Sequence, residues 1–459
     1  MQILEVTLKA VKDLNAAKYN PRKKLKPGDA LYQDIRASIE EFGFCQNLVW
    51  NQRTRTLVGG HQRVLVATRE FKATHLPTAV VDISEEDEQR LNVMLNAIGE
   101  GNWNNAKLAK ILQDLNERVQ ADVYRLGLSA QTVDELLGRK KPTPKQDPDE
   151  AAPKPTVPKT KAGDLYRFVS ADADPIHWLM CGDSTSSEDV ATLMQGAEAR
   201  ILFTDPPYGV SYDDAARGNH GPASKGTICN DELRAGALRD FLRAAFTAAH
   251  EATMANTAAY VFYASKTHRE FETALEQAGW EVRQQLIWTK QLALSRADYH
   301  WAHEPCLYAG KPEQDAPWFS EEMRADWFWA HQGADYHWMH QPILYAAKDG
   351  GSTPWFGDRT QTTVWAEKRD SAKHVIHACQ KPIGLARKAM ANSTLRRDNV
   401  LDLFGGSGST LIAAEMEGRN AYVMEQDPGW CDSTVTRYLA TFENVEVYRN
   451  GKPVNAIEK

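Results

Sequence analysis

The chain has 459 residues, of which 42% are apolar and 25% are charged, and its formal net charge is −7. This length exceeds one ordinary hydrophobic core and predicts two or three domains, while the composition excludes a largely disordered chain. The negative charge does not by itself indicate a nucleic-acid partner. It does not exclude one, because DNA binding needs a local basic face rather than a basic total.

No run of 18 apolar residues is present, so no membrane span is predicted. The N-terminus lacks the basic stretch and apolar core of a secretion signal. The six cysteines include no C-x-x-C pair, which argues against a zinc site or a disulfide framework. We therefore expect no metal, no membrane partner and a reducing, cytoplasmic location.

The first 138 residues are expected to form a small α+β domain with a helical tail. In chain order, the pattern predicts a helix at 30–42, a hairpin at 47–60, a helix at 60–71, a strand near 78–83 and helices within 84–137. In the first helix, Leu31, Ile35, Ile39 and Phe42 fall on one face, and Gly43 follows as a stop.

A Pro-rich and charged segment, residues 139–161, separates this unit from the rest of the chain. It holds six prolines among Lys, Asp and Glu, with almost nothing apolar to bury. Such a composition is typical of an extended, semi-rigid linker rather than of packed structure.

Residues 162–459 alternate apolar strands with helices, as in a doubly wound α/β sheet. Two short strands, 199–205 and 399–404, each end at a polar or glycine-rich turn. Helices are predicted at 232–250, 266–278, 383–392, 410–418 and 428–442.

A segment inside this unit is duplicated at a spacing of 37 residues. Residues 297–319 recur as 334–356, with fourteen of the 23 positions identical. Two copies are too few for a solenoid array, so we interpret them as a local duplication. The copies differ at Glu304, which corresponds to Gln341, and the sequence leaves open which copy serves a functional site.

The tetrad Asp205-Pro206-Pro207-Tyr208 directly follows the first strand. The carboxyl ends of strands are where open α/β sheets bind ligands. Two prolines fix the backbone and leave carbonyl oxygens as acceptors, Asp205 adds a carboxylate, and Tyr208 offers a flat face for stacking. This set suits a planar ring with an exocyclic amine, which would have to be flipped out of a duplex. Taken alone, a proline-rich turn after a strand explains the tetrad comparably well.

Residues 402–410 form a glycine-rich turn between the second strand and a helix. Glycines permit a tight turn, and the helix amides point toward a bound ligand. No Lys follows the glycines, so this is not a phosphate-binding P-loop. Glu425 ends the next strand about 20 residues later, a spacing that suits a carboxylate accepting from ribose hydroxyls. By itself, this motif fits a nicotinamide cofactor as well.

Together, the two motifs resemble the β-type amino-methyltransferases of DNA, in which a D-P-P-Y segment precedes F-x-G-x-G. The resemblance covers roughly residues 162–443 and includes Cys181-Gly182-Asp183 and Gln380-Lys381-Pro382 in the family's order. It implies a Rossmann-like, class I S-adenosylmethionine-dependent methyltransferase fold of the α/β class. The expected sheet has seven strands and is mostly parallel, with one antiparallel member.

The resemblance implies a site-specific enzyme that transfers a methyl group from S-adenosylmethionine to the N6 amine of a flipped adenine in double-stranded DNA, as in restriction-modification systems. Catalysis and base binding would fall to Asp205, Pro206, Pro207 and Tyr208. Lys381 would flank the methionine end of the cofactor, and Glu425 its ribose. The full set expected to bind the cofactor is Asp183, Lys381, Asp402, Phe404, Gly405, Gly406, Ser407, Gly408, Ser409 and Glu425.

Two alternatives concern the same domain. An aspartate that opens the tetrad is typical of adenine-N6 enzymes and a serine of cytosine-N4 enzymes, so cytosine N4 is the second candidate target. A non-catalytic DNA-binding regulator is another candidate, but three intact motifs argue against it. The sequence indicates neither the recognition sequence nor whether the protein is a monomer or a homodimer.

Two N-terminal motifs, Asn20-Pro21-Arg22 and V-G-G-H-Q-R at 58–63, resemble conserved boxes of the ParB/sulfiredoxin-like fold over about residues 1–100. The resemblance implies a nucleotide or phosphate site formed by Arg22, Gly60, His61 and Arg63, since helix amides and guanidinium groups favour anions. His61 and Gln62 replace the Glu and the first Arg of the partition proteins' box, which argues against nucleotide hydrolysis. A DNA-associated accessory role is expected, with a ParB-domain nuclease or nucleotide switch as the alternative.

Overall fold

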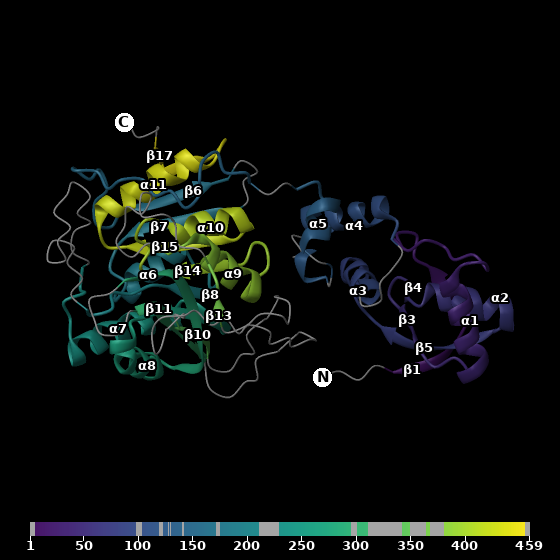
Figure 1. Ribbon diagram of the computed structural model, residues 1–459. Helices are drawn as coiled ribbons and strands as arrows, with labels where there is room; N and C mark the ends of the chain where they lie inside the picture. Colours follow the sequence, from purple (N-terminus) through teal and green to yellow (C-terminus); the bar gives the residue numbers. More distant parts are fainter. Residues whose placement is uncertain are drawn as a thin grey trace. The chain divides into compact units, whose positions relative to one another are not determined.

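The computed structural model describes residues 5–97, 103–118, 123–126, 128, 130–139, 142–170, 175–210, 229–294, 301–310, 342–348, 364–367 and 381–454. The chain divides into two compact units, Met1–Lys140 and Lys141–Lys459 (Figure 1). Among the described residues, no helix has the length and apolar character needed to cross a membrane.

The first unit is an α+β fold, as predicted, around a mixed sheet with the strand order β1-β5-β3-β4-β2. Its strands are β1 (Val6–Ala10), β2 (Asn15–Ala16), β3 (Leu48–Asn51), β4 (Thr56–Gly59) and β5 (His75–Val81). Its helices are α1 (Ala30–Phe42), α2 (His61–Phe71), α3 (Glu85–Ala97), α4 (Asn105–Arg118) and α5 (Ala130–Leu136), with single 3-10 turns η1 (Val11–Asp13) and η2 (Val123–Arg125). β3 and β4 form the predicted hairpin.

Helix α1 has the predicted bounds and ends at Gly43, and of its predicted aliphatic face only Ile35 and Ile39 are half-buried. Leu31 and Phe42 are 40% and 67% exposed, whereas Tyr32 is 1% exposed. The Tyr32 hydroxyl donates to Glu70 on α2, so a tyrosine docks this helix. Tyr32, Ile35 and Ile39 lie on one face at helical spacing, so the covered face is the centre of the predicted one and its two ends are exposed.

The second unit is built on a sheet that has twelve strands within the described residues, in the order β13-β10-β11-β12-β9-β8-β14-β15-β7-β6-β16-β17. The strands are β6 (Leu165–Val169), β7 (Ile176–Cys181), β8 (Ala199–Thr204), β9 (Thr253–Phe262), β10 (Trp280–Leu294), β11 (Trp301–Gly310), β12 (Pro342–Lys348), β13 (Val364–Trp365), β14 (Asn399–Asp402), β15 (Asn420–Glu425), β16 (Glu446–Arg449) and β17 (Lys452–Pro453). The helices are α6 (Ser187–Met194), α7 (Ala235–Glu251), η3 (Ser265–Thr267), α8 (His268–Gln277), α9 (Ile383–Ser393), α10 (Ser409–Glu417) and α11 (Pro428–Thr441).

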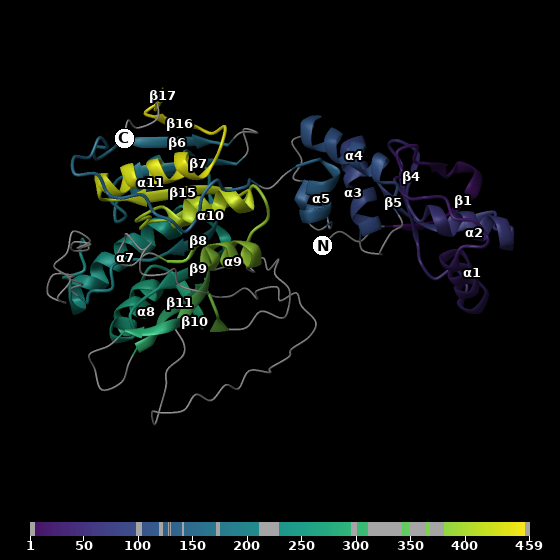
Figure 2. The same ribbon diagram turned by 45° about the horizontal axis from the view of Figure 1, so that its top comes forward.

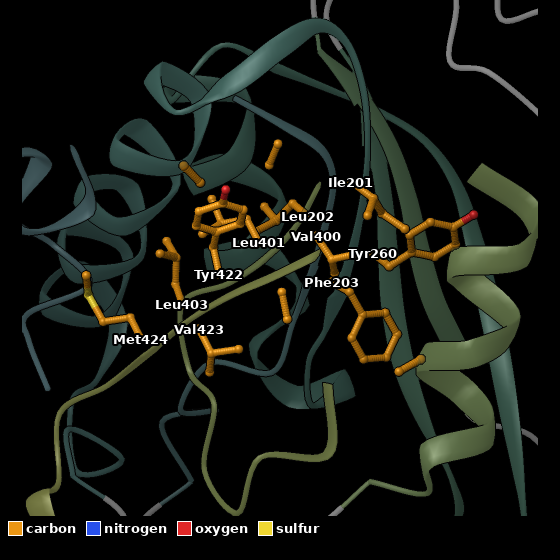
Figure 3. Packing of buried hydrophobic residues seen from close by; sticks show 14 of the residues in the cluster. Ile201, Leu202, Phe203, Tyr260, Val400, Leu401, Leu403, Tyr422, Val423 and Met424 are labelled. Carbon is orange, nitrogen blue, oxygen red and sulfur yellow. The ribbon is translucent and has the colours of Figure 1, made fainter. Parts of the chain in front are cut away.

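The five central strands, β9, β8, β14, β15 and β7, are all parallel, which is the predicted doubly wound core. Antiparallel pairings flank them on both sides, so the sheet is wider than the seven strands expected. Figure 3 shows the buried side chains of the centre, which come from β8 (Ile201, Leu202, Phe203), β14 (Val400, Leu401) and β15 (Tyr422, Val423, Met424). Burial on both faces is why these strands are continuous apolar runs in the sequence.

From the adjacent strands β8 and β14, the chain winds in opposite directions, β8 to β9 by way of α7 and β14 to β15 by way of α10. Because such crossovers share one hand, α7 and α10 lie on opposite faces of the sheet. Helix α8 packs with α7, and α9 packs with α10 (Figure 2). Helix α6 also packs with α7. The carboxyl ends of β8 and β14 therefore form the topological switch point, the usual ligand site of such sheets.

The segment expected to be an unpacked linker instead lies against α11 as part of the second unit; we call residues 145–160 the strap. The amide of Lys145 donates to the carbonyl of Thr441 over 2.9 Å, and the hydroxyl of Ser433 donates to the carbonyl of Ala152 over 2.5 Å. The linker was predicted from its lack of apolar side chains, and that criterion does not detect a segment held by hydrogen bonds. Here the contacts are made by backbone groups and by polar side chains of α11.

The duplicated segment provides β11 and β12, while residues 297–300, 311–319, 334–341 and 349–356 of the two copies lie outside the described residues. Tyr308 of β11 and Tyr345 of β12 each pair with Tyr260 of β9 and with Gln284 of β10. A strand has two hydrogen-bonding edges, and β9 and β10 each use their other edge for β8 and β13. The two copies therefore share pairing partners on β9 and β10, and they also pair with each other in parallel, Tyr308 with Tyr345.

Deletion of residues 312–348 removes β12 and keeps β11, which pairs with both β9 and β10. We expect the shortened protein to unfold cooperatively within about 4 °C of the full chain, the shift that roughly 1 kcal/mol causes in a domain of a few hundred residues. Thermal unfolding followed by circular dichroism measures this. A broad, non-cooperative transition would show that both copies are needed to build the sheet.

Candidate active site

The two predicted motifs meet at the switch point, where a buried carboxylate joins them. Asp402 ends β14, and its Oδ1 accepts from the hydroxyl of Thr204 over 3.0 Å and from the amide of Phe404 over 3.1 Å. Its Oδ2 accepts from the hydroxyl of Thr410 over 2.6 Å. Burial raises the pKa of Asp402 to about 6 despite these three donors. Thr204 immediately precedes Asp205, so the tetrad is fixed beside the glycine-rich turn.

Three side chains form a hydrogen-bonded triangle at the end of β8. Lys381 Nζ donates to Asp205 Oδ2 over 2.7 Å and to the Tyr208 hydroxyl oxygen over 2.9 Å. The Tyr208 hydroxyl donates to Asp205 Oδ1 over 2.6 Å. Lys381 is only 7% exposed, and its ammonium group also lies 5.0 Å from the centre of the Phe262 ring. Both oxygens of Asp205 are therefore held by groups of the chain itself.

Lys381 contacts the tetrad, and its expected place beside the methionine end of the cofactor stays a prediction. It precedes α9, and its ammonium group faces the tetrad rather than the glycine-rich turn. The motif in the sequence located Lys381 near the active site. The pairing with Asp205 joins residues 176 positions apart, which local pattern does not encode.

The backbone of the tetrad is fixed on both sides. Pro206 is buried, and the hydroxyl of Thr267 donates to the carbonyl of Tyr208 over 2.9 Å. The Tyr208 ring meets Phe271 edge to face, with ring centres 6.3 Å apart. The tetrad therefore presents its acceptors in one arrangement, as a recognition site requires.

The glycines of the turn at 404–408 are required by packing within the chain. A Cβ on Gly405 would lie 2.3 Å from Val423 Cγ1 of β15. Gly408 has φ +82°, and a Cβ there would lie 2.5 Å from Thr434 Cγ2 of α11. These two glycines let β15 and α11 approach the turn closely. From the sequence alone, the same glycines were explained by the close approach of a ligand.

Glu425 lies at the carboxyl end of β15, where its carboxylate supports the turn. Oε2 accepts from the amide of Gly406 over 2.7 Å, and Oε1 accepts from the amide of Asp427 over 2.8 Å. Burial of the carboxyl group raises the pKa of Glu425 to about 7. Each oxygen keeps a second lone pair, so the group can still accept from hydroxyls.

Asp183 lies next to this carboxylate. It follows β7, the neighbour of β15, and the amide of Gly182 donates to the carbonyl of Glu425 over 3.2 Å. Asp183 Oδ1 accepts from both the amide and the hydroxyl of Thr185. The predicted residues of this domain therefore gather at the ends of the four parallel strands β7, β15, β14 and β8.

A family model described as DNA methylase, for N6- and N4-methyltransferases, matches residues 199–436. The match covers more than half of the chain and includes the tetrad, Lys381, the glycine-rich turn and Glu425. The chain belongs to the DNA methylase family.

Individual relatives of this DNA methylase match it over short segments or at low sequence identity. The type II methyltransferase M2.MboI of Moraxella bovis is 39% identical over 62 residues, which span 14% of this chain and 23% of that protein. The structure of M1.HpyAVI with SAM is 16% identical, covers 56% of this chain and 98% of its own, and has a TM-score of 0.37. A Pnob8-like ParB-N domain matches 29% of this chain and 63% of its own at 16% identity and a TM-score of 0.20. Neither structural likeness reaches a TM-score of 0.5, so the family assignment depends on the family model.

S-adenosylmethionine is the cofactor of this DNA methylase. The residues at the switch point fit it, since Glu425 offers a carboxylate for ribose hydroxyls and α10 begins directly after the glycine-rich turn. The cofactor supplies a methyl group activated by its attachment to a positively charged sulfur.

The four N-terminal residues predicted to bind an anion also lie close together. Gly60 is the N-cap of α2, Arg63 Nη1 donates to the carbonyl of Gln46, and burial together with the charge of Arg22 lowers the pKa of Arg63. His61 accepts from the amide of Ala17, and burial lowers the pKa of His61 to about 4. An imidazole with a pKa this low is a weak base, and its acceptor nitrogen is already bonded, which argues against its use as a general base.

Two residues that organise the site were missed in the sequence. Thr204 supplies the hydroxyl that reaches Asp402, and Arg437 is fully buried with Nη1 on the carbonyl of Ser407 over 2.9 Å. A hydroxyl at the end of an apolar strand and an arginine within a predicted helix are visible signals. Neither indicates its partner.

We expect cofactor affinity to rise with pH through the raised pKa of Glu425. A carboxyl with pKa about 7 is mostly protonated at pH 6 and mostly ionised at pH 8. If only the carboxylate accepts from the ribose, binding at pH 6 should be roughly tenfold weaker than at pH 8. Calorimetric titration with S-adenosylmethionine across this range measures the change.

The control is Glu425→Gln, which cannot titrate, while Asp402 and Asp427 remain. Its affinity should be lower than that of the natural protein at pH 8 and should change less between pH 6 and pH 8. Equal pH profiles for the two proteins would assign the titration to another group.

Proposed function

We propose that this DNA methylase transfers the methyl group of S-adenosylmethionine to the N6 amine of adenine in double-stranded DNA at a specific sequence. One observation carries the proposal: the tetrad and the glycine-rich turn lie side by side, joined through Thr204 and Asp402. This adjacency supports a site in which the target base and the methyl donor bind at the same switch point.

The chemistry of the tetrad supports an exocyclic amine as the methyl acceptor. The lone pair of such an amine is delocalised into the ring, so the nitrogen attacks poorly unless its hydrogens are bound by acceptors. Asp205 and the carbonyl of Pro206 are acceptors of this kind. The nitrogen loses one proton for each methyl group that it gains, and the Asp205 carboxylate is the group positioned to take it.

Lys381 has a second part in this proposal. Its ammonium group holds Asp205 and Tyr208 in place, and the Tyr208 ring is also held by Phe271. The incoming base must insert among groups already bonded to one another, so it meets preformed acceptors. The base has to leave the duplex to reach them, which makes base flipping part of the cycle.

Adenine N6 is favoured over cytosine N4 by the aspartate that opens the tetrad, following the resemblance to the adenine enzymes. Cytosine N4 is the alternative, because both bases present an exocyclic amine. The match to a type II methyltransferase supports a place in a restriction-modification system.

Identification of the methylated nucleoside tests the proposal. The full-length protein is incubated with unmethylated double-stranded DNA and methyl-labelled S-adenosylmethionine, and the digested DNA is analysed by mass spectrometry. We expect N6-methyladenine, and Asp205→Ala should reduce the yield at least about 10²-fold, since the acceptor of the amine hydrogen is lost. Detection of N4-methylcytosine would keep the mechanism but overturn the assignment of adenine as the target base. Cofactor binding without any labelled base would overturn the function.

A Lys381→Met substitution separates a role at Asp205 from a role at the cofactor. We expect kcat to fall roughly 10- to 100-fold, the effect of losing a charged hydrogen bond worth about 1.5–3 kcal/mol. Affinity for S-adenosylmethionine should stay within about twofold. The matched control is Lys388→Met on α9, which removes the same charge from a side chain over Trp365. A large loss of cofactor affinity with kcat unchanged would show that Lys381 acts in cofactor binding instead.

A further inference from the structure

The strap contacts the methyl-transfer site from outside the region that matches the family model, which begins at residue 199. Its end is held by Asp432 of α11, whose Oδ2 accepts from the amide of Lys159 over 2.6 Å and whose Oδ1 accepts from the hydroxyl of Thr160 over 2.5 Å. Lys154 forms an ion pair with Asp427, whose amide donates to Glu425. The strap is therefore fixed beside Glu425, the carboxylate expected to accept from the ribose hydroxyls.

A buried arginine connects the strap to the glycine-rich turn. Arg437 Nη2 donates to the carbonyl of Pro148 over 2.7 Å. Its Nη1 lies 2.9 Å from the carbonyl of Ser407 and 3.3 Å from the hydroxyls of Ser407 and Ser409. A guanidinium is a rigid planar fork, so an acceptor on one nitrogen fixes the direction of the other. The Pro148 carbonyl thereby orients the group that holds the turn.

The next strap residue supports the Lys381 segment. Helix α9 begins after Pro382, which provides no side-chain cap, and Asp149 Oδ1 accepts instead from the amide of Ile383 over 2.8 Å. A carboxylate at a helix N-terminus satisfies an amide and complements the helix dipole. Ile383 is two residues after Lys381, so Asp149 fixes the backbone from which the Asp205 partner extends.

We propose that Pro148 and Asp149 are positioning residues of the methyl-transfer site, the first acting on the glycine-rich turn through Arg437 and the second on Lys381 through the start of α9. The inference rests on the proposed function for its kinetic consequence. Its structural consequence is independent of activity. The residues expected to be a passive linker are thus part of the site.

Full-length Asp149→Ala, Asp149→Asn and Glu150→Ala test the Asp149 arm. Glu150 is the matched control, an exposed carboxylate one position along the strap. We expect Asp149→Ala to speed hydrogen exchange at the Ile383 amide and to lower kcat, each about tenfold, within the range for losing a helix cap. Asp149→Asn keeps an acceptor oxygen and should restore both, while Glu150→Ala should match the natural protein.

The Pro148 arm is tested with Arg437→Lys against Arg449→Lys. Arg449 donates to the strap carbonyl of Lys159 over 2.8 Å and, within the described part of the chain, makes no hydrogen bond to the turn, so it controls for strap binding alone. We expect Arg437→Lys to weaken S-adenosylmethionine binding at least about fivefold, and Arg449→Lys to leave it within twofold. Should either Asp149→Ala or Arg437→Lys fail to fold, the other carries the test.

A purely structural strap predicts a different result. Asp149→Ala would then lower the melting temperature while kcat and cofactor affinity stayed at the natural values, and that outcome overturns the inference. If the natural protein transfers no methyl group, the proposed function fails. Hydrogen exchange at Ile383 and cofactor affinity still decide whether the strap positions the site.

Discussion

The site depends on the buried carboxylate of Asp402, because this residue ends β14 and accepts hydrogen bonds from the neighbouring strand and from the helix after the glycine-rich turn. Thr204 reaches it from β8, and Thr410 from α10. The pKa of about 6 shows that burial costs more than these bonds return. The carboxyl group of Asp402 therefore holds its proton more tightly in the folded protein than in the unfolded chain. As pH rises from about 4 through 6, the contribution of Asp402 to the free energy of unfolding falls.

Much of this arrangement could be predicted from the sequence, because the chemistry stands at the ends of apolar strands. Parallel strands put their carboxyl ends on one edge, so the tetrad at 205–208, the turn at 404–409 and Glu425 were expected to meet. The partners of Lys381, Asp149 and Arg437 were not predicted. Their contacts span 176, 234 and 289 positions, and such choices are made by packing, which local periodicity does not contain.

The expectation of an unpacked linker and the expected extent of the covered face of α1 differ from the structure for a related reason. Both arguments counted apolar side chains. The strap is held by carbonyls and carboxylates, including Pro148 and Asp149, and α1 is held by the hydroxyl-bearing ring of Tyr32. A segment poor in apolar residues can still be ordered when its backbone groups find fixed partners. The boundary of a sequence family therefore need not be the boundary of its working unit.

The shared register of β11 and β12 has a consequence for how this protein can change over time. The two copies share pairing partners on β9, so a substitution in one copy leaves the other copy's pairing sequence intact. The copies have already diverged where Cys306 corresponds to Ile343. The duplication thus gives the stretch of sheet between β10 and β9 two sequences with the same pairing partners, which can differ from each other while both remain paired.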